Sequence, residues 1–262
     1  MLIVGICAGP SGRAGRIALP PVQRLGLPVI VRLGETSIFE AYNSIVDEAI
    51  GLDDLTGLVL IHDDVELRDD RLVEKVHDGF RTADVLGVIG GVGLDRSMDW
   101  AEARQTFGWA VDDRRSRDFG PPPPGGVDSV DGIFLGLSPR ACRELRFDAG
   151  HFDGFHGYDA DICAQAKSRG LQVGLVHIDM HHHNGGRETD LVAYGRAEER
   201  WLAKWRPGVR PVRRRRKRLP ERLIRAAGRR VTRSPGRAGA RGNEPGGGSP
   251  GHGRSAPPGP RA

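Results

Sequence analysis

Carboxylate and imidazole side chains gather in three short clusters along the chain. They are His62-Asp63-Asp64, the pair Asp159 and Asp161, and His181-His182-His183. One carboxylate and one imidazole, together with phosphate oxygens from a substrate, form a suitable ligand set for Mn²⁺ or Mg²⁺. A second carboxylate that holds no metal can act as a general base on an incoming hydroxyl. The sequence offers carboxylates for both tasks, provided that the fold brings the clusters together.

Each cluster also has a purely structural interpretation. Three consecutive histidines are compatible with a solvated turn, in which neighbouring side chains point in different directions. Asp159 precedes a predicted helix, where it could serve only as an N-terminal cap or dipole partner. Asp63 and Asp64 could form an ordinary turn after a strand. The occurrence of all three clusters in this order favours a catalytic and metal-binding role over these structural ones.

The first cluster follows four branched apolar residues, Leu58–Ile61. An apolar run without alternation predicts a strand buried on both faces, as in a parallel sheet. Open α/β sheets bind their ligands at the carboxyl ends of such strands. Two adjacent carboxylates at that edge would repel each other unless a cation or a bound ligand compensated them.

The remaining elements alternate between strands and helices up to about residue 205. Strands are predicted at 2–8, 28–32, 85–89, 127–136 and 171–176, and helices at 38–50, 70–81 and 190–205. This alternation predicts βαβ units, an α/β class and a mainly parallel sheet flanked by helices. Ser37 and Glu40 are spaced as a capping box, and Ser138 is placed to cap a short helix. Residues 93–126 lack a clear period and are expected to form a long excursion with a small hairpin.

Charge divides the chain into two parts. From residue 206 onward there are 17 basic and two acidic residues, whereas residues 1–205 carry 22 basic and 32 acidic residues. The three cysteines are far apart and form no CxxC motif, which argues against a zinc-thiolate site and suits a reducing compartment such as the cytoplasm. No stretch approaches the length of a membrane span.

Four segments together resemble the GT-A nucleotide-sugar glycosyltransferases, specifically the family 2 type and its glycosyltransferase-like branch. The segments are Ser37–Asn43, Leu60–Val65, Val130–Gly132 continued by Phe152-Asp153 and Gly157–Cys163, and Gly170–Val173 leading into the histidines and Gly185-Gly186. The resemblance covers residues 2–205. It implies a Rossmann-like GT-A fold and an inverting, metal-dependent transfer of a sugar from a nucleotide-diphosphate donor to an acceptor hydroxyl.

The resemblance also implies roles for individual residues. Asp64 would bind Mn²⁺ or Mg²⁺, with His183 or His182 completing the metal site. Asp63 would lie near the ribose or phosphate of the donor, and Asp159 would be the catalytic base. Further substrate contacts are implied for Asn43, Asp131, Gly132 and Asp161.

Two positions depart from the motifs of that family. His62 stands where most members carry the first Asp of the metal motif, which weakens the expected ribose contact. Tyr158 stands where the base motif usually has Glu, which leaves a single carboxylate at that step. Two other functions therefore remain open: a non-catalytic nucleotide- or sugar-binding module on the same fold, and a metal-dependent hydrolase.

The expected organisation is a glycosyltransferase-like domain at 1–206, a basic and amphipathic segment at 207–231, and a disordered Gly/Pro/Arg-rich tail at 232–262. The basic segment is compatible with an anionic membrane surface, with nucleic acid, or with a merely solubilising role. We favour the membrane surface over nucleic acid because residues 219–231 have an apolar side. The predicted protein is thus cytoplasmic, peripheral at the inner face of the membrane, and acts on a glycan or lipid-linked acceptor.

Overall fold

The structure is a computed structural model that describes residues 1–113, 115–183 and 190–210, all within the unit Met1–Arg213. Among these residues, no helix is long and apolar enough to cross a membrane. The disordered tail predicted at 232–262 and almost all of the basic segment predicted at 207–231 lie outside the described residues.

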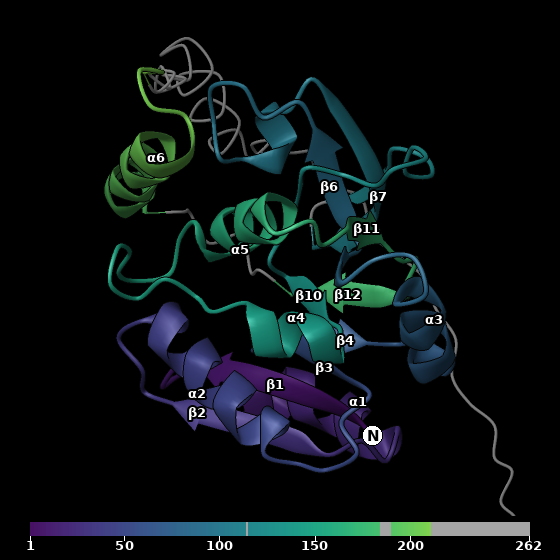
Figure 1. Ribbon diagram of the computed structural model, residues 1–262. Coiled ribbons are helices and arrows are strands. Elements are labelled where there is room, and N and C mark those ends of the chain that lie inside the picture. The colour runs from purple at the N-terminus through teal and green to yellow at the C-terminus, as the bar shows by residue number, and fades with distance from the viewer. Residues whose placement is uncertain (114, 184–189, 211–262) are drawn as a thin grey trace, which may run out of the picture. The chain divides into compact units, whose positions relative to one another are not determined.

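Six strands form the first sheet (Figure 1), in the order β2-β1-β3-β10-β5-β11. Their bounds are β2 Val29–Leu33, β1 Leu2–Ala8, β3 Gly57–His62, β10 Phe134–Leu137, β5 Val85–Gly87 and β11 Val173–Leu175. Only β10 runs antiparallel to its neighbours, and the other pairs are parallel. Five strands therefore place their carboxyl ends at one edge, which confirms the predicted α/β class and mainly parallel sheet.

Both faces of this sheet are covered by helices, because β1 and β3 are apolar at nearly every position. Ile3, Leu58 and Leu60 pack in a core with the helices α2 (Ile38–Ile50), α4 (Pro139–Glu144) and α5 (Tyr158–Ser168). Val59 and Ile61 face a second core, to which α1 (Leu19–Arg24) and α3 (Leu72–Gly79) contribute. The four apolar residues before His62 are fully buried, as the sequence predicted.

Helix α2 approaches the sheet very closely at Gly5 in the middle of β1. A Cβ atom on Gly5 would lie 2.6 Å from both the Ile45 and Leu60 side chains. A larger residue would therefore push α2 away from the sheet. This contact therefore sets the distance between α2 and strand β1.

A second sheet has the order β4-β12-β7-β6-β9, with β8 paired to β7 (Figure 1). Its strands are β4 Val65–Leu67, β12 Met180–His182, β7 Gln105–Asp112, β6 Ile89–Val92, β9 Ser129–Val130 and β8 Ser116–Asp118. Only the β12–β7 pair is parallel. The antiparallel β7–β8 pair is the hairpin predicted within residues 93–126, whereas the second sheet as a whole was not predicted.

Two strands predicted as continuous are divided between the sheets. The run 85–89 forms β5 in the first sheet and β6 in the second, with Val88 between them. The run 127–136 likewise forms β9 and β10. Every residue of 85–89 is buried, so hydrophobicity alone could not reveal the change of sheet.

Helix starts agree only partly with the prediction. Ser37 occupies the N-cap position of α2, but its side chain makes no capping hydrogen bond, so the predicted capping box is wrong. The amide of Ile38 instead donates to the carbonyl of Gly154 at 2.9 Å. Ser138 does cap α4, because its Oγ accepts from Ala141 N at 3.1 Å. The last helix, α6 (Leu191–Trp205), is capped by Asp190.

Candidate functional site

A cavity of about 730 Å³ lies at the carboxyl-terminal edge of the first sheet. The ends of β1 and β3, the turn before β10, the start of α5, strand β12 and the segment around Trp100 all contribute to it. Its chemistry-bearing lining residues are Cys7, Glu35, His62, Asp63, Asp64, Asp99, Trp100, Asp131, His156, Tyr158, Asp159, His182 and Tyr194. The fold therefore brings all of the first cluster and one member of each of the other two, Asp159 and His182, to one place.

His62, Asp64 and His182 form a group whose ligand atoms all lie within 4.8 Å of one another. Nε2 of His182 lies 3.2 Å from Oδ1 of Asp64. Although it is buried, this oxygen has no hydrogen-bond partner among the described residues. Its 3.2 Å contact with His182 is an ion pair, which places the two atoms where they would ligate a shared cation. Two imidazoles and one carboxylate suit a divalent cation chemically.

Charge around Asp64 keeps this carboxylate ionised. Burial alone would raise its pKa, but His182, His62 and Arg13 outweigh that effect and hold the pKa below its ordinary value. Nη1 of Arg13 lies 2.8 Å from Asp64 Oδ2, and each side chain is only 11% exposed. Arg13 was not predicted, because the glycine-containing loop at 9–15 matches no nucleotide-binding motif.

The pKa values of the two cavity histidines are shifted in opposite directions. Burial lowers the pKa of His62, and the neighbouring His182 lowers it further. Burial acts in the same direction on His182, but there the Asp64 carboxylate outweighs it and raises the pKa. Asp63, next to Asp64, is held by the β1 loop, since Gly9 N donates to its Oδ2 at 3.1 Å.

Asp159 lies in the first turn of α5 and points to the same cavity. Its Oδ2 accepts from Gly132 N at 3.1 Å, and its Oδ1 accepts from Ala160 N at 2.9 Å. Burial, with the nearby Asp131 and Asp99 carboxylates, raises the pKa of Asp159 to about 7. A carboxylate with such a pKa is suited to accept a proton near neutral pH.

Asp131 and Gly132 shape the wall beside Asp159. Asp131 accepts from Trp100 Nε1 at 2.8 Å and from Ile133 N at 3.0 Å. A Cβ atom on Gly132 would lie only 2.0 Å from Tyr158 Oη, so only glycine fits there. Asp131 lines the cavity, while Gly132 acts through its backbone amide and its lack of a side chain.

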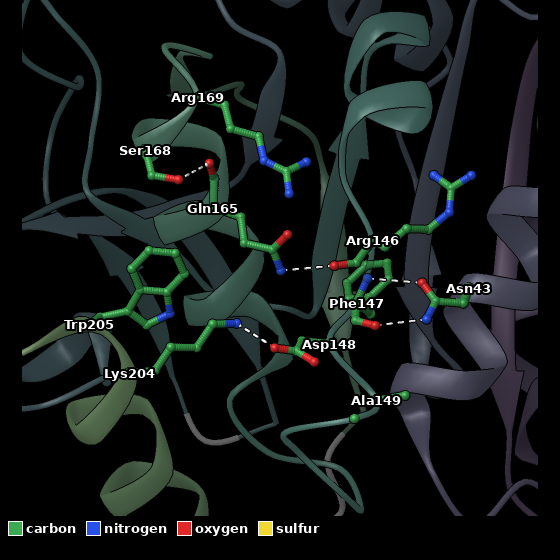
Figure 2. A pocket seen from close by; sticks show the side chains of 11 residues that line it. Asn43, Arg146, Phe147, Asp148, Ala149, Gln165, Ser168, Arg169, Lys204 and Trp205 are labelled. Atoms are coloured by element: carbon green, nitrogen blue, oxygen red, sulfur yellow. Dashed lines mark hydrogen bonds and ion pairs between the residues drawn. The ribbon is translucent and has the colours of Figure 1, made fainter.

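Asn43 lies away from this cavity, in a separate hollow of about 570 Å³ (Figure 2). Its side-chain amide donates to Phe147 O at 2.7 Å and accepts from Phe147 N at 2.9 Å. The amide group thus uses both its nitrogen and its oxygen to join α2 to the segment before α5. These contacts favour a structural role over the substrate contact implied by the resemblance.

Asp161 is also committed to structure, although it lies only two residues after Asp159. It is fully buried and accepts from Lys204 at 2.8 Å, from Trp205 Nε1 at 2.7 Å and from Gln165 at 2.8 Å. Lys204 in turn reaches Asp148 at 2.7 Å, which Figure 2 shows beside the Trp205 ring. This network attaches the end of α6 to α5.

The three consecutive histidines form strand β12 and its end rather than a solvated turn. Because side chains alternate along a strand, His182 points to Asp64 while His181 and His183 turn the other way. His183 contacts Glu66 and Asp113. Of the two predicted metal ligands, the structure therefore brings His182 to Asp64 and places His183 elsewhere. His62, which the prediction treated only as a departure, occupies the remaining corner of the group.

Comparison with known proteins agrees with the resemblance. The sequence model of the glycosyltransferase-like family matches residues 22–205. The chain is also 32% identical over 209 residues to the streptomycin biosynthesis protein StrF of Streptomyces griseus, covering 77% of this chain and 73% of StrF. The chain belongs to the glycosyltransferase-like family. The predicted transferase class is thereby confirmed.

Solved structures resemble the chain more distantly. A197 from STIV is 11% identical with a TM-score of 0.45, covering 69% of this chain and 84% of A197. GalNAc-T7, solved with UDP, GalNAc and Mn²⁺, is 12% identical with a TM-score of 0.47, covering 72% of this chain and 45% of that protein. These similarities are too low to assign a role to any residue, so the site rests on the contacts given above.

Proposed function

We propose that this protein is an inverting, divalent-metal-dependent glycosyltransferase that moves a sugar from a nucleotide-diphosphate donor to an acceptor hydroxyl. One observation carries the proposal: the group of His62, Asp64 and His182 shares a single cavity with Asp159. The transfer needs a positive centre for the leaving diphosphate and a separate base for the acceptor. The cavity holds residues for both.

On the donor side of the cavity, where the nucleotide diphosphate would lie, stands the metal-binding group of His62, Asp64 and His182. His62, Asp64 and His182 would hold Mn²⁺ or Mg²⁺, which when bound would neutralise charge on the leaving diphosphate. The 3.2 Å ion pair of Asp64 Oδ1 with His182 Nε2, with His62 in the same group of ligand atoms, supports this fit. Arg13 keeps Asp64 ionised and in place, and Asp63 lies beside it at the cavity wall for a contact with the ribose or phosphate.

The acceptor side is formed by Asp159. As the acceptor oxygen attacks the sugar carbon, its proton passes to the Asp159 carboxylate and the bond from that carbon to the diphosphate breaks. A single displacement of this kind inverts the configuration at the sugar carbon. The hydrogen bonds from Gly132 N and Ala160 N fix the carboxylate, and Asp131 keeps its pKa high enough to bind a proton.

Isothermal titration calorimetry of the full chain with UDP and GDP, with and without Mn²⁺, tests the donor side. We expect one nucleotide to bind at least tenfold more tightly with Mn²⁺ than with EDTA. Affinity that is the same with and without the cation would contradict metal dependence. Cation binding unaffected by any nucleotide would instead favour the hydrolase.

A screen of nucleotide-sugar donors for nucleotide release, with glycan and lipid-linked acceptors supplied, tests the transfer itself. Metal-dependent nucleotide binding without turnover of any donor would favour the binding module. The anomeric configuration of the product, read by NMR, then distinguishes inversion from retention. Retention would contradict the role proposed for Asp159.

A further inference from the structure

Strand β12 presents histidines on both of its sides, and only one side belongs to the cavity. His182 faces His62, with ring centroids 5.8 Å apart. The rings of His181 and His183 lie 4.3 Å from each other, and neither residue lines the cavity. The donor site thus leaves two of the three consecutive histidines without a function.

A carboxylate lies against this second pair of histidines. Oδ1 of Asp113, the residue that follows β7, is 2.9 Å from His181 Nε2 and 3.7 Å from His183 Nδ1. One ligand atom from each of the three side chains lies within 4.8 Å of the others. Ligand atoms about 2.0–2.2 Å from a tetrahedral Zn²⁺ are separated by roughly 3–4 Å, and both measured separations from Asp113 are close to that range.

The other ring nitrogen of His183 is oriented by a further carboxylate. Its Nε2 lies 2.8 Å from Glu66 Oε2, and Glu66 is itself held by Arg68 at 2.7 Å. A carboxylate on the far nitrogen of a histidine is the usual outer partner of a metal-bound imidazole, because it fixes the tautomer and the ring orientation. This contact leaves Nδ1 of His183 directed toward Asp113.

We propose that Asp113, His181 and His183 form a second divalent-cation site, selective for Zn²⁺ and similar borderline metals, with Glu66 as the outer partner of His183. The side chains are 18–34% exposed, so a cation can reach them from solvent and water can fill the fourth position. The site joins the ends of β7 and β12 and, through Glu66, strand β4. It also anchors the residues on either side of His182 and so supports the donor site from the opposite face of the strand.

The number of bound cations tests this proposal. Metal-stripped full-length protein is titrated with Co²⁺ and Zn²⁺, and stoichiometry is measured by equilibrium dialysis and by the visible absorption of Co²⁺. We expect two equivalents for the wild type and one for His181→Asn/His183→Asn. His182→Asn should also bind one equivalent, and His151→Asn, an exposed histidine elsewhere, should keep both.

The second site and the donor site can fail separately in this experiment. One equivalent in the wild type that His182→Asn removes would overturn the second site and leave the donor site intact. One equivalent that only His181→Asn/His183→Asn removes would support the second site and contradict the metal dependence proposed for the transfer.

If His181→Asn/His183→Asn does not fold, Asp113→Asn provides the same test, because it keeps both imidazole rings. We expect Asp113→Asn to bind Zn²⁺ at the second site at least tenfold more weakly, while the affinity of the donor site is unchanged. Unchanged affinity for both equivalents would count against the site. Thermal unfolding gives an independent measurement, since Zn²⁺ should raise the Tm of His182→Asn, in which only the second site remains.

Discussion

His62 Nε2 and Tyr158 Oη lie 2.6 Å apart, so the two residues that depart from the family motifs are bonded to each other. His62 belongs to the metal-binding group and Tyr158 precedes the proposed base. Because Tyr158 occupies Nε2, the other ring nitrogen of His62 is the one left for a cation. The two departures are therefore in direct contact, and this contact links the proposed donor and acceptor sides of the cavity.

Tyr158→Phe tests this connection. Loss of the hydroxyl leaves the His62 ring without its outer partner, and such changes typically cost 10- to 100-fold in metal affinity. We expect the Kd for Mn²⁺, measured by calorimetry, to rise by about that factor. Tyr194→Phe, a tyrosine that lines the same cavity, is the matched control and should bind Mn²⁺ as the wild type does. Equal affinities in both variants would mean that Tyr158 only fills space.

Asp159→Asn separates catalysis from binding. The amide cannot accept the acceptor proton, so the transfer rate should fall by about 10²–10⁴-fold. Mn²⁺-dependent nucleotide affinity should change little, because Asp159 is not part of the metal-binding group. Activity comparable to the wild type, measured by nucleotide release with an acceptor present, would remove Asp159 from the mechanism.

The pKa of Asp159, about 7, sets a pH dependence. The ionised form is the active base, so kcat/KM should be constant above that pKa and should fall about tenfold for each pH unit below it. Asp131→Asn removes a carboxylate that raises this pKa, so the acid limb should move to lower pH. An acid limb that stays in place in Asp131→Asn would assign it to a different group.

Asp161→Asn should affect stability rather than chemistry. Asp161 accepts three hydrogen bonds in a fully buried position, and the amide would leave Lys204 with only part of its charge compensation. We expect a loss of about 2 kcal/mol or more in the free energy of unfolding, measured in urea. Unchanged stability with a higher KM for the donor would restore the substrate contact implied by the resemblance.

Asn43→Ala distinguishes the two roles considered for that residue. It breaks both hydrogen bonds to Phe147 and leaves a partly buried amide and carbonyl without partners, at a cost of about 1–3 kcal/mol. Nucleotide affinity should stay within about threefold of the wild-type value, because Asn43 does not line the cavity. A tenfold weaker affinity with an unchanged Tm would instead show a contact with the donor.

The sequence predicted the first sheet well because its signals are local. The apolar spacing gave α2 its observed bounds, Ile38–Ile50, and the run before His62 identified the central strand β3 correctly. Asp64 follows the parallel strand β3 at the edge where such sheets bind ligands; Asp159 reaches the same cavity from the start of α5, after the antiparallel strand β10.

Other features depend on contacts that no local pattern reveals. Strand β12 has only three residues, two of them histidines, and it exists because β4 and β7 pair with it. Arg13 is 170 residues from His183 in the chain, yet its guanidinium donates to the His183 carbonyl. Asn43 and Asp161 resemble binding residues by type and position, and only their hydrogen-bond partners favour a structural role.

The chain passes from the first sheet to the second between β5 and β6 and returns between β9 and β10, and these two points lie next to each other. The chain leaves the first sheet at Val88 and returns at Asp131, and Asp131 N donates to Ile89 O at 2.9 Å. Residues 89–130 therefore start and finish at one point, closed by the pairing of β6 with β9. Evolution can lengthen, shorten or exchange such a segment without shifting the register of β5 against β10. A change in this segment would thus alter the cavity wall at Asp99 and Trp100, while strand β3, which ends at His62, stays in place.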